Sequence, residues 1–329
     1  MHNQISQHQV FRFKHQVIRD LAWSLWGPAL LIHDTPYAET VNNERANSDR
    51  FFPLDEQWLQ QLDQQPQVLI TYLEEKNTRL LGTYFEALWQ FYFSHHQRFK
   101  QCICNLQIND DSRTVGEFDV LVTTQEEQNF HIELTCKFYL EWQDSSQKTL
   151  WIGPNCADRL DFKYHKTDTH QLPLLNTELG QKSYQQQALN THNVQQLAIW
   201  RGTPFPSNHW FKAQELASDG VLTAWRSQND ILWFIAEKSL WLSPVIQPRE
   251  SLKTYHQVCQ QVDHHFQCEN DNKRHYTLML IALAFNEENQ QWQQQQQFFI
   301  TPNNWPYGKL ADSALTPLRP CKPPVCINR

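Results

Sequence analysis

Hydrophobic residues recur at helical spacing through the first hundred positions of the chain. Residues 11–31 form an amphipathic pattern that the Gly-Pro pair at residues 27–28 interrupts, and a shorter pattern covers residues 54–67. The pattern over residues 77–96 is the most regular of the three. Its apolar stripe is spaced by four, three and four residues: Leu81, Phe85, Leu88 and Tyr92.

Strand-like segments replace the helical pattern between residues 102 and 140. Residues 102–108, 115–123 and 130–140 are joined by short polar loops, which predicts a meander of antiparallel strands entered from a helix. Residues 156–172 then return to a helical pattern, introduced by a turn at residues 151–155.

The chain beyond residue 190 is rich in tryptophan and predicts isolated strands. We expect strands at residues 194–200, 222–227 and 231–242, a helix over 248–266, and a hairpin formed by residues 275–285 and 296–302. The glutamine-rich residues 289–297 are predicted to extend the hairpin turn into solvent. Residues 1–76 are thus predicted as a helical region, 77–190 as the core, and 191–329 as a strand-rich region packed on that core.

Composition narrows the class of protein. The 329 residues are 40% hydrophobic and include 13 Trp and 19 Phe, which is typical of a globular protein. Only 8 glycines are present, and neither GxxxxGK[ST] nor GxGxxG occurs, nor GxSxG or HExxH. These absences argue against P-loop enzymes, dinucleotide-binding folds, α/β-hydrolases and common zinc peptidases.

Charge and cysteine usage bear on partners and compartment. The formal net charge of −7 argues against a protein that coats nucleic acid non-specifically, while a local binding groove stays compatible with it. The N-terminal residues lack the apolar segment of a secretory signal, and no apolar run is long enough to span a membrane. The 8 cysteines are scattered without CxxC spacing, which favours reduced thiols and a cytoplasmic location.

Acidic and basic residues recur on the second and third predicted strands. Alternation places Glu133, Thr135 and Lys137 on one face of the third strand, and Asp119 on the neighbouring strand can lie beside them. A sheet with one solvated face and ordinary cross-strand ion pairs explains this pattern equally simply. That alternative predicts that Glu86, on the preceding helix, lies far from the other acids.

Glu86 favours a functional site. It is flanked along its helix by Gly82, Trp89 and Phe93, which is unusual for a charge that only solvates a surface, although a partly buried ion pair is also compatible with it. Mg²⁺ binds one or two carboxylates, waters and substrate phosphates, and a nearby lysine can orient a water and neutralise the transition state. The residue types therefore match a phosphodiester-cleaving site.

These motifs resemble the PD-(D/E)XK nuclease superfamily. "LGTYFEALWQF", "GEFDVLV", "IELTCKFYL" and "WIGPN" followed by "DRLDFK" are more closely similar to the bacterial domain-of-unknown-function 1853 family, over most of the chain. The resemblance implies an α/β fold with an αβββαβ nuclease-like core, N-terminal helices and a strand-rich C-terminal half. It implies that Glu86 and Asp119 hold Mg²⁺ or Mn²⁺ and that Lys137 is the catalytic lysine.

The sequence departs from the superfamily pattern at one position. Thr135 stands two residues before Lys137, where an acid is usual, and Glu133 lies two residues further back, about 6.6 Å along an extended strand. Either Glu133 serves as the third metal ligand and catalytic acid through a shifted register, or metal binding is weakened, or the fold is retained without cleavage. The expected function is a metal-dependent nuclease, and the alternative is a catalytically degenerate module that binds nucleic acid or protein.

The helix after the strands carries candidate substrate-binding residues. Arg159, Lys163 and Lys166 recur along one helical face, and His170 and Gln171 follow. In a nuclease they would bind phosphates of a nucleic acid. A solvated helix whose basic residues pair with Asp158 and Asp161 is the alternative.

Overall fold

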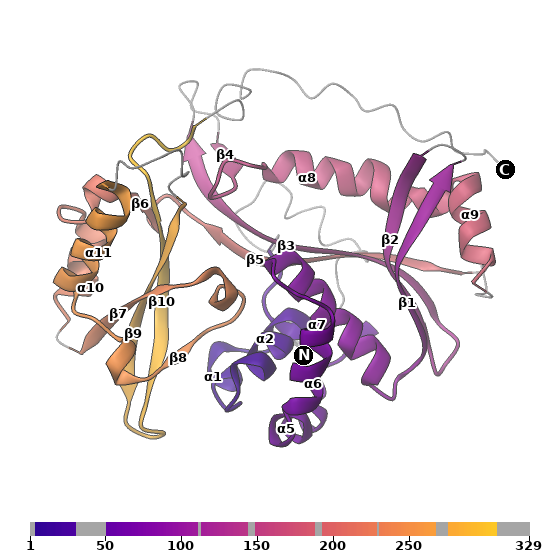
Figure 1. The fold of residues 1–329 in the computed structure, drawn as a ribbon, viewed down its shortest axis with the longest axis horizontal. Coiled ribbons are helices and arrows are strands. Elements are labelled where there is room, and N and C mark those ends of the chain that lie inside the picture. The colour runs from indigo at the N-terminus through magenta and orange to yellow at the C-terminus, as the bar shows by residue number, and fades with distance from the viewer. Residues whose placement is uncertain are drawn as a thin grey trace.

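The protein has a mixed α/β fold that contains two sheets (Figure 1). The computed structural model describes residues 4–30, 51–110, 113–143, 149–187, 193–228, 230–267 and 276–307. Across these ranges, none of the helices combines the length and the apolar character needed to cross a membrane.

The N-terminal helices agree with the sequence pattern except around Pro66. The predicted helices are found as α2, α5 and α7, and α5 ends close to Pro66 as expected, but a further helix, α6, begins directly after that proline. Proline tolerates the start of a helix because its fixed φ suits the first turn and its missing N–H would be unpaired there. The helices are α1 (Gln7–Val10), α2 (Gln16–Trp26), α5 (Glu56–Gln64), α6 (Gln67–Glu75) and α7 (Leu81–His95).

The first sheet contains the predicted meander. Strands β1, β2 and β3 are antiparallel neighbours, as expected, and β5 runs parallel to β3 on its other edge. A short strand, β4, which the sequence pattern had suggested only as a turn, also pairs with β3. The strands are β1 (Phe99–Asp110), β2 (Arg113–Thr124), β3 (Asn129–Gln143), β4 (Thr149–Ile152) and β5 (Gln195–Phe205). The sheet therefore includes a strand from beyond residue 190.

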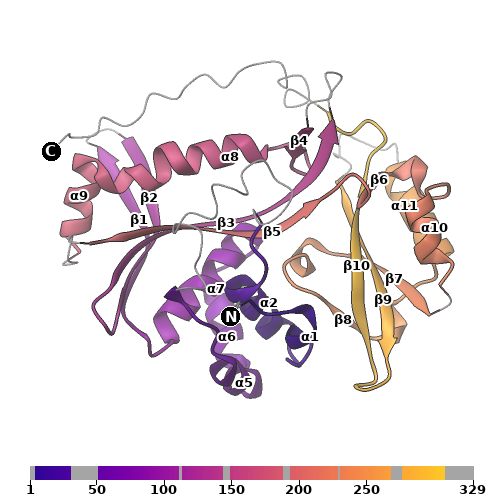
Figure 2. The ribbon, with the colours of Figure 1, turned by 180° about the vertical axis from the view of Figure 1, so that it is seen from behind.

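Helices cover both faces of the first sheet (Figures 1 and 2). α2 and α7 pack against one face through a cluster that includes Val120, Ile132 and Leu134. On the other face lie α8 (Leu160–Lys166), a π-helical turn (Thr167–Gln171), a 3-10 turn (Leu172–Asn176) and α9 (Glu178–Gln185). The long helix expected over residues 156–172 is therefore a shorter α-helix that continues with irregular hydrogen bonding.

The second sheet packs against the end of the first. Its apolar face contacts Phe138, Leu140 and Phe205, and helices α10 and α11 cover its opposite face (Figure 2). Its strands have the order β6-β10-β9-β7, and β8 also pairs with β10. The elements are β6 (Trp210–Lys212), α10 (Gly220–Arg226), β7 (Ile231–Ala236), a 3-10 turn (Lys238–Leu240), β8 (Ile246–Gln247), α11 (Tyr255–Gln267), β9 (Leu278–Asn286) and β10 (Gln291–Thr301).

Two elements predicted in the C-terminal half were too long, since the strand expected over residues 231–242 ends at Ala236 and the helix expected over residues 248–266 begins at Tyr255. Two other predictions gave the wrong type of element. Residues 222–227, expected as a strand, lie mostly in α10, because Asp219 accepts hydrogen bonds from the N–H groups of Val221 and Leu222 and so caps a helix. The glutamine-rich segment, expected as a solvated turn, forms most of β10, and Gln293 and Gln294 are buried. A run of identical polar residues has no alternation to reveal a strand, and here the apolar partner β9 supplies the pairing.

Buried polar contacts hold the helices and both sheets together. Arg201 on β5 donates to the C-terminal carbonyl oxygens of α2, with 2.9 Å from Nε to Ser24 O and 2.7 Å from Nη2 to Leu25 O. A positive charge at the C-terminal end of a helix is also stabilised by the helix dipole. The carboxyl group of Asp20 accepts hydrogen bonds from the hydroxyls of Ser243 and Tyr84, at 2.6 and 2.8 Å.

Gly202 is expected to be essential for the pairing of β3 with β5. Its φ is +112°, and a Cβ built there would lie 1.8 Å from the carbonyl oxygen of Lys137 on β3. We expect Gly202→Ala to lower the free energy of unfolding by about 3 kcal/mol, measured by urea denaturation. Gly220→Ala is the matched control, because a Cβ there meets open space, and its effect should stay within about 0.5 kcal/mol. Equal effects of the two substitutions would contradict this account.

Candidate active site

One stretch of β3 has a free edge. β5 pairs with β3 along residues 130–140, but on the opposite edge β2 pairs only as far as Ile132 and β4 only from Leu140. Within the described ranges, no strand pairs with residues 133–139 on that edge. Their main-chain groups are therefore available to side chains, water or a ligand.

A pocket of about 440 Å³ lies beside this free edge. Glu86 of α7 lines one wall, and Thr135 and Lys137 of β3 contribute at the edge itself. Lys163 of α8 and Lys238 of the C-terminal half also line the pocket. Four separate segments of the chain thus meet here, and the volume lies within the range of small-ligand sites.

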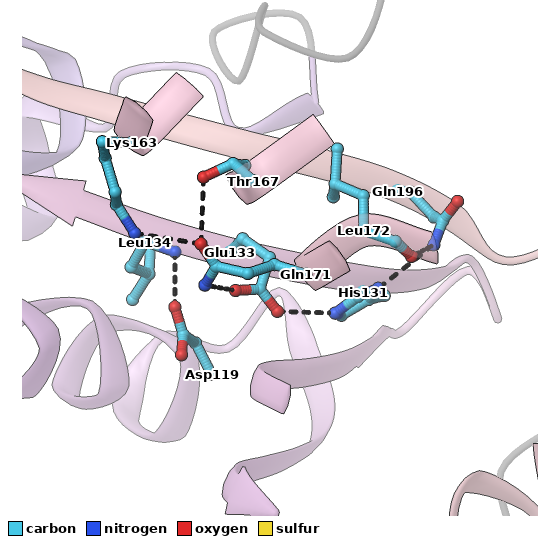
Figure 3. A network of polar contacts seen from close by, with 9 residues as sticks. All are labelled: Asp119, His131, Glu133, Leu134, Lys163, Thr167, Gln171, Leu172 and Gln196. Atoms are coloured by element: carbon cyan, nitrogen blue, oxygen red, sulfur yellow. Dashed lines mark hydrogen bonds and ion pairs between the residues drawn. The ribbon is translucent and has the colours of Figure 1, made fainter. Parts of the chain in front are cut away.

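Asp119 occupies the point where β2 leaves β3. Its Oδ2 accepts a hydrogen bond of 2.8 Å from the backbone N–H of Leu134 (Figure 3). β2 offers no carbonyl to this N–H, since its pairing with β3 ends at Val120 and Ile132. Because β2 leaves β3 here, the N–H of Leu134 lacks a main-chain acceptor, and the side chain of Asp119 takes its place.

Regular alternation would place Phe118, Val120 and Val122 on one face of β2, but it does not persist through this point. Val120 and Val122 pack against α7, as members of one face should, but Phe118 packs with Leu121 in the cluster on the opposite side. A strand that twists away from its partner changes which side chains share a face. Sequence periodicity alone could not predict the direction of Asp119 for this reason.

Glu133 lies at the centre of a buried hydrogen-bond network (Figure 3). Its side chain is 1% exposed, its Oε1 lies 2.9 Å from His131 Nε2, and its Oε2 accepts from Gln171 Nε2 at 2.5 Å. Gln171 Oε1 in turn accepts from Lys163 Nζ at 3.0 Å and from the Thr167 hydroxyl at 2.9 Å. Gln171 therefore fixes the Lys163 ammonium relative to Glu133.

His131 acts in this network as a neutral donor. Complete burial lowers the pKa of His131 to about 4. Its Nδ1 lies 3.3 Å from Gln196 Nε2, which can only donate, so the ring proton resides on Nε2 and points to Glu133. The contact is thus a hydrogen bond to a carboxyl group and not an ion pair at neutral pH.

Three carboxyl groups in this region have raised pKa values. Burial, followed by the charges of Asp119 and Glu117, raises the pKa of Glu86 to about 7. Burial and the neighbouring Glu133 raise the pKa of Asp119 to about 7, and burial does the same for Glu133. Since Glu133 raises the pKa of Asp119 and Asp119 raises that of Glu86, negative charge is concentrated here and a bound cation would relieve it.

Lys163 supplies the positive charge that acts on these acids. It lowers the pKa of Glu86, Asp119 and Glu133 alike, against the effect of burial. Burial lowers the pKa of Lys163 itself, and the carboxylates partly offset this. Lys137, the lysine predicted as catalytic, lines the same pocket, but its Nζ pairs with Asp158 Oδ2 at 2.7 Å and its side chain is 42% exposed.

The other predicted substrate-binding residues lie in different environments. Arg159 is buried, and its guanidinium contacts both carboxylate oxygens of Asp161, as the alternative for this helix expected. Lys166 is exposed, and the ring Nδ1 of His170 lies 2.7 Å from the hydroxyl of Thr169. Only Lys163 and Gln171 of this set contribute to the network around Glu133.

The carboxylates fit a cation with few protein ligands better than a closed metal cage. In the part of the chain that the structure describes, no three His, Cys, Asp or Glu side chains are arranged to hold a metal ion together. Mg²⁺ commonly uses one or two carboxylates and completes its shell with water and phosphate oxygens. Glu86 and Asp119 suit that mode, whereas both oxygens of Glu133 already accept hydrogen bonds.

Several of these residues were predicted from the sequence, but not all of their contacts. Glu86, Asp119 and Glu133 were expected as site residues and Lys163 and Gln171 as substrate-binding residues, whereas His131 and Gln196 were given no role. The alternation of β3 puts His131 on the same face as Glu133, which was the available signal. No sequence pattern could indicate that Lys238 lines the pocket, because residue 238 is far along the chain from the other pocket residues.

The raised pKa values predict how stability depends on pH. Between about pH 4.5 and 7 these three carboxyl groups bind more protons in the folded protein than in the unfolded chain, so their contribution to the free energy of unfolding should fall as the pH rises through this window. The lowered pKa of His131 offsets part of this fall. Asp119→Asn should reduce that fall by about 2 kcal/mol, measured by urea denaturation at pH 5 and 8 in chelator. Glu127→Gln, at an exposed acid, is the control and should keep the parental slope. A parental slope in Asp119→Asn would contradict the burial of this charge.

Comparison with known proteins assigns the family but no activity. Neither the curated proteins nor the solved structures contain a match. A family model described as a domain of unknown function, DUF1853, matches residues 19–301, which is most of the chain. The protein therefore belongs to the DUF1853 family.

Proposed function

We propose that this protein is a metal-dependent, nuclease-like enzyme that hydrolyses phosphodiester bonds of nucleic acid. The observation that carries the proposal is the meeting of Glu86, Asp119 and Lys163 at the free edge of β3. Two carboxylates and an ammonium group beside open main-chain groups match what phosphodiester hydrolysis requires.

The order of elements supports the resemblance to PD-(D/E)XK nucleases. α7 is followed by β1, β2 and β3, then by α8 and later by β5, which is the αβββαβ order with β4 and further helical turns inserted. Glu86, Asp119 and Lys137 stand on the first helix, second strand and third strand, as the resemblance implies.

The residues of the chain have separable roles in this proposal. Glu86 and Asp119 would hold Mg²⁺ or Mn²⁺, which when bound acidifies a water molecule and offsets charge on the scissile phosphate. Lys163 donates to Gln171 and has further N–H groups that can bind a phosphate oxygen. Glu133 orients Gln171 and, through Gln171, the ammonium group of Lys163. It remains a candidate third metal ligand and catalytic acid. Lys137, beside Asp158, would bind the phosphate next to the scissile one.

Cleavage assays with Mg²⁺ test this proposal. Asp119→Ala and Glu86→Ala should each reduce the cleavage rate at least about a hundredfold, because each removes a ligand for the cation. Lys163→Ala should reduce kcat by about a hundredfold, whereas Lys137→Ala should mainly raise KM. Rates are measured on labelled oligonucleotides with chelator as the blank, and Lys182→Ala, at an exposed position of α9, is the control.

Two outcomes would change the assignment. A larger loss of kcat in Lys137→Ala than in Lys163→Ala would return the catalytic role to Lys137. Cleavage that is equal in the parent, Asp119→Ala and Glu86→Ala, or missing from all of them, would remove the enzymatic proposal.

A non-catalytic module is the second candidate function. It is favoured by Thr135, buried at the position where an acid is usual, and by the hydrogen bonds that already occupy both oxygens of Glu133. Calorimetric titration with Mn²⁺ separates the two candidates. Binding that Asp119→Ala abolishes supports the enzyme, and retained nucleic-acid binding without any Mn²⁺ binding supports the module.

The dimensions of the pocket favour a single strand as the substrate. Its approximately 440 Å³ is bounded by α7, by α8 and by the C-terminal half, so Glu86 lies in a space suited to one or two nucleotides. Lys238 is exposed, it forms no ion pair among the described residues, and its Nζ lies 5.8 Å from the centre of the Trp241 ring. It is therefore free to bind a phosphate outside the scissile position.

Lys238→Gln is expected to weaken the binding of a single-stranded oligonucleotide about threefold to tenfold at low salt, through the loss of one phosphate contact. Fluorescence anisotropy in Ca²⁺ or chelator measures this without cleavage. Lys182→Gln removes the same charge away from the pocket and should change little. Equal affinity for blunt duplex and single strand would contradict the inferred substrate.

A further inference from the structure

Two cysteines of β1 lie in contact on one side of the strand. Cys102 and Cys104 are separated by one residue, and their Sγ atoms lie 3.3 Å apart. Both thiols are half-buried, and they pack against the cluster formed by α7 and the N-terminal helices. Neither residue belongs to the pocket that Glu86 and Lys163 line.

The strand geometry allows these two sulfurs to bond. Residues two apart on an extended strand are separated by about 6.6 Å between Cα atoms, which lies just within the range that disulfides span. β1 is an edge strand of the first sheet and pairs with β2. Asn105, directly after Cys104, has a φ of +54°, so the strand already departs from regular extension at this point.

The surroundings favour attack by one of the two thiols. The hydrogen bond from Cys102 lowers the pKa of Cys104. The charge of Lys76, at the end of α6, lowers it further, and burial only partly offsets these two effects. The same hydrogen bond, with burial, raises the pKa of Cys102. Cys104 is thus the nucleophile and Cys102 the resolving thiol, since thiolates and not thiols react with oxidants.

We propose that Cys102 and Cys104 form a redox-active dithiol that a peroxide converts reversibly into a disulfide. The Cys104 thiolate attacks a peroxide oxygen, the O–O bond breaks, and the departing oxygen takes up a proton to leave water or an alcohol. Cys102 then attacks the sulfur of the Cys104 sulfenic acid, the S–O bond breaks, and a second molecule of water leaves with the Cys102 proton. Two thiols lose two electrons and two protons, and the peroxide accepts them.

Asn105, directly after Cys104, links β1 to two neighbouring elements. Its side chain accepts from Gln90 of α7 at 2.7 Å and donates to Glu117 of β2 at 3.1 Å.

Peptide mass spectrometry tests the dithiol in the intact protein. Trypsin releases residues 101–113 as one peptide that contains Cys102 and Cys104 and no other cysteine. After brief treatment of the folded protein with hydrogen peroxide, this peptide should be lighter by two hydrogen atoms and resist alkylation. Dithiothreitol should restore both thiols, while Cys156 and Cys259, each half-buried, should stay alkylatable.

The variants distinguish a dithiol from two independent thiols. In Cys102→Ser, the peptide should gain oxygen at Cys104, because no resolving thiol remains, and in Cys104→Ser, Cys102 should stay reduced at the same dose. A parental peptide that gains oxygen, or that keeps two alkylatable thiols after Cys104 has reacted in Cys102→Ser, would overturn the proposal. This result is independent of the cleavage and metal assays, so either proposal can fail alone.

Discussion

The interrupted pairing of β3 is the constraint on which the candidate site depends. β2 separates from β3 after Ile132, and β4 joins the same edge only at Leu140, so seven residues present one unpaired edge. A buried edge of this kind leaves hydrogen-bonding groups that must find other partners. The side chain of Asp119 accepts the hydrogen bond of the Leu134 N–H. The pocket that Glu86 and Lys163 line lies along the rest of this unpaired edge.

The opposite edge of the same segment is held rigidly. β5 pairs in parallel along the whole stretch, and Gly202 allows its backbone to approach Lys137 more closely than any residue with a side chain could. Arg201, the adjacent residue, fastens β5 to the end of α2 through two buried hydrogen bonds. One edge of β3 is thus fixed by regular pairing while the other is available for chemistry, a division that keeps functional side chains on a stable support.

The charges at the free edge are organised by a second layer of uncharged groups. Neutral His131 and the amide of Gln171 hold Glu133, and Gln171 also holds Lys163. Burial keeps the three acids at the boundary between protonated and ionised forms near neutral pH. Such a cluster is costly to leave uncompensated, and a bound cation or a shared proton would offset that cost. The enzymatic and the binding proposals differ in which of these two the protein uses.

Local sequence determined most of the N-terminal helices, the three-stranded meander and the acidic residues of the site, since each depends on periodicity or residue type within a short window. It failed at α10, where a helix cap outweighed strand propensity, and at β10, where repeated glutamine gave no alternation. Tertiary structure decided the rest. The direction of Asp119 follows from the point at which β2 leaves β3, and the lysine among the acids comes from α8, whose position over the sheet is set by tertiary packing. Lys238 and Gly202 matter through contacts with segments distant in the chain, and such contacts leave no periodic trace in a single sequence.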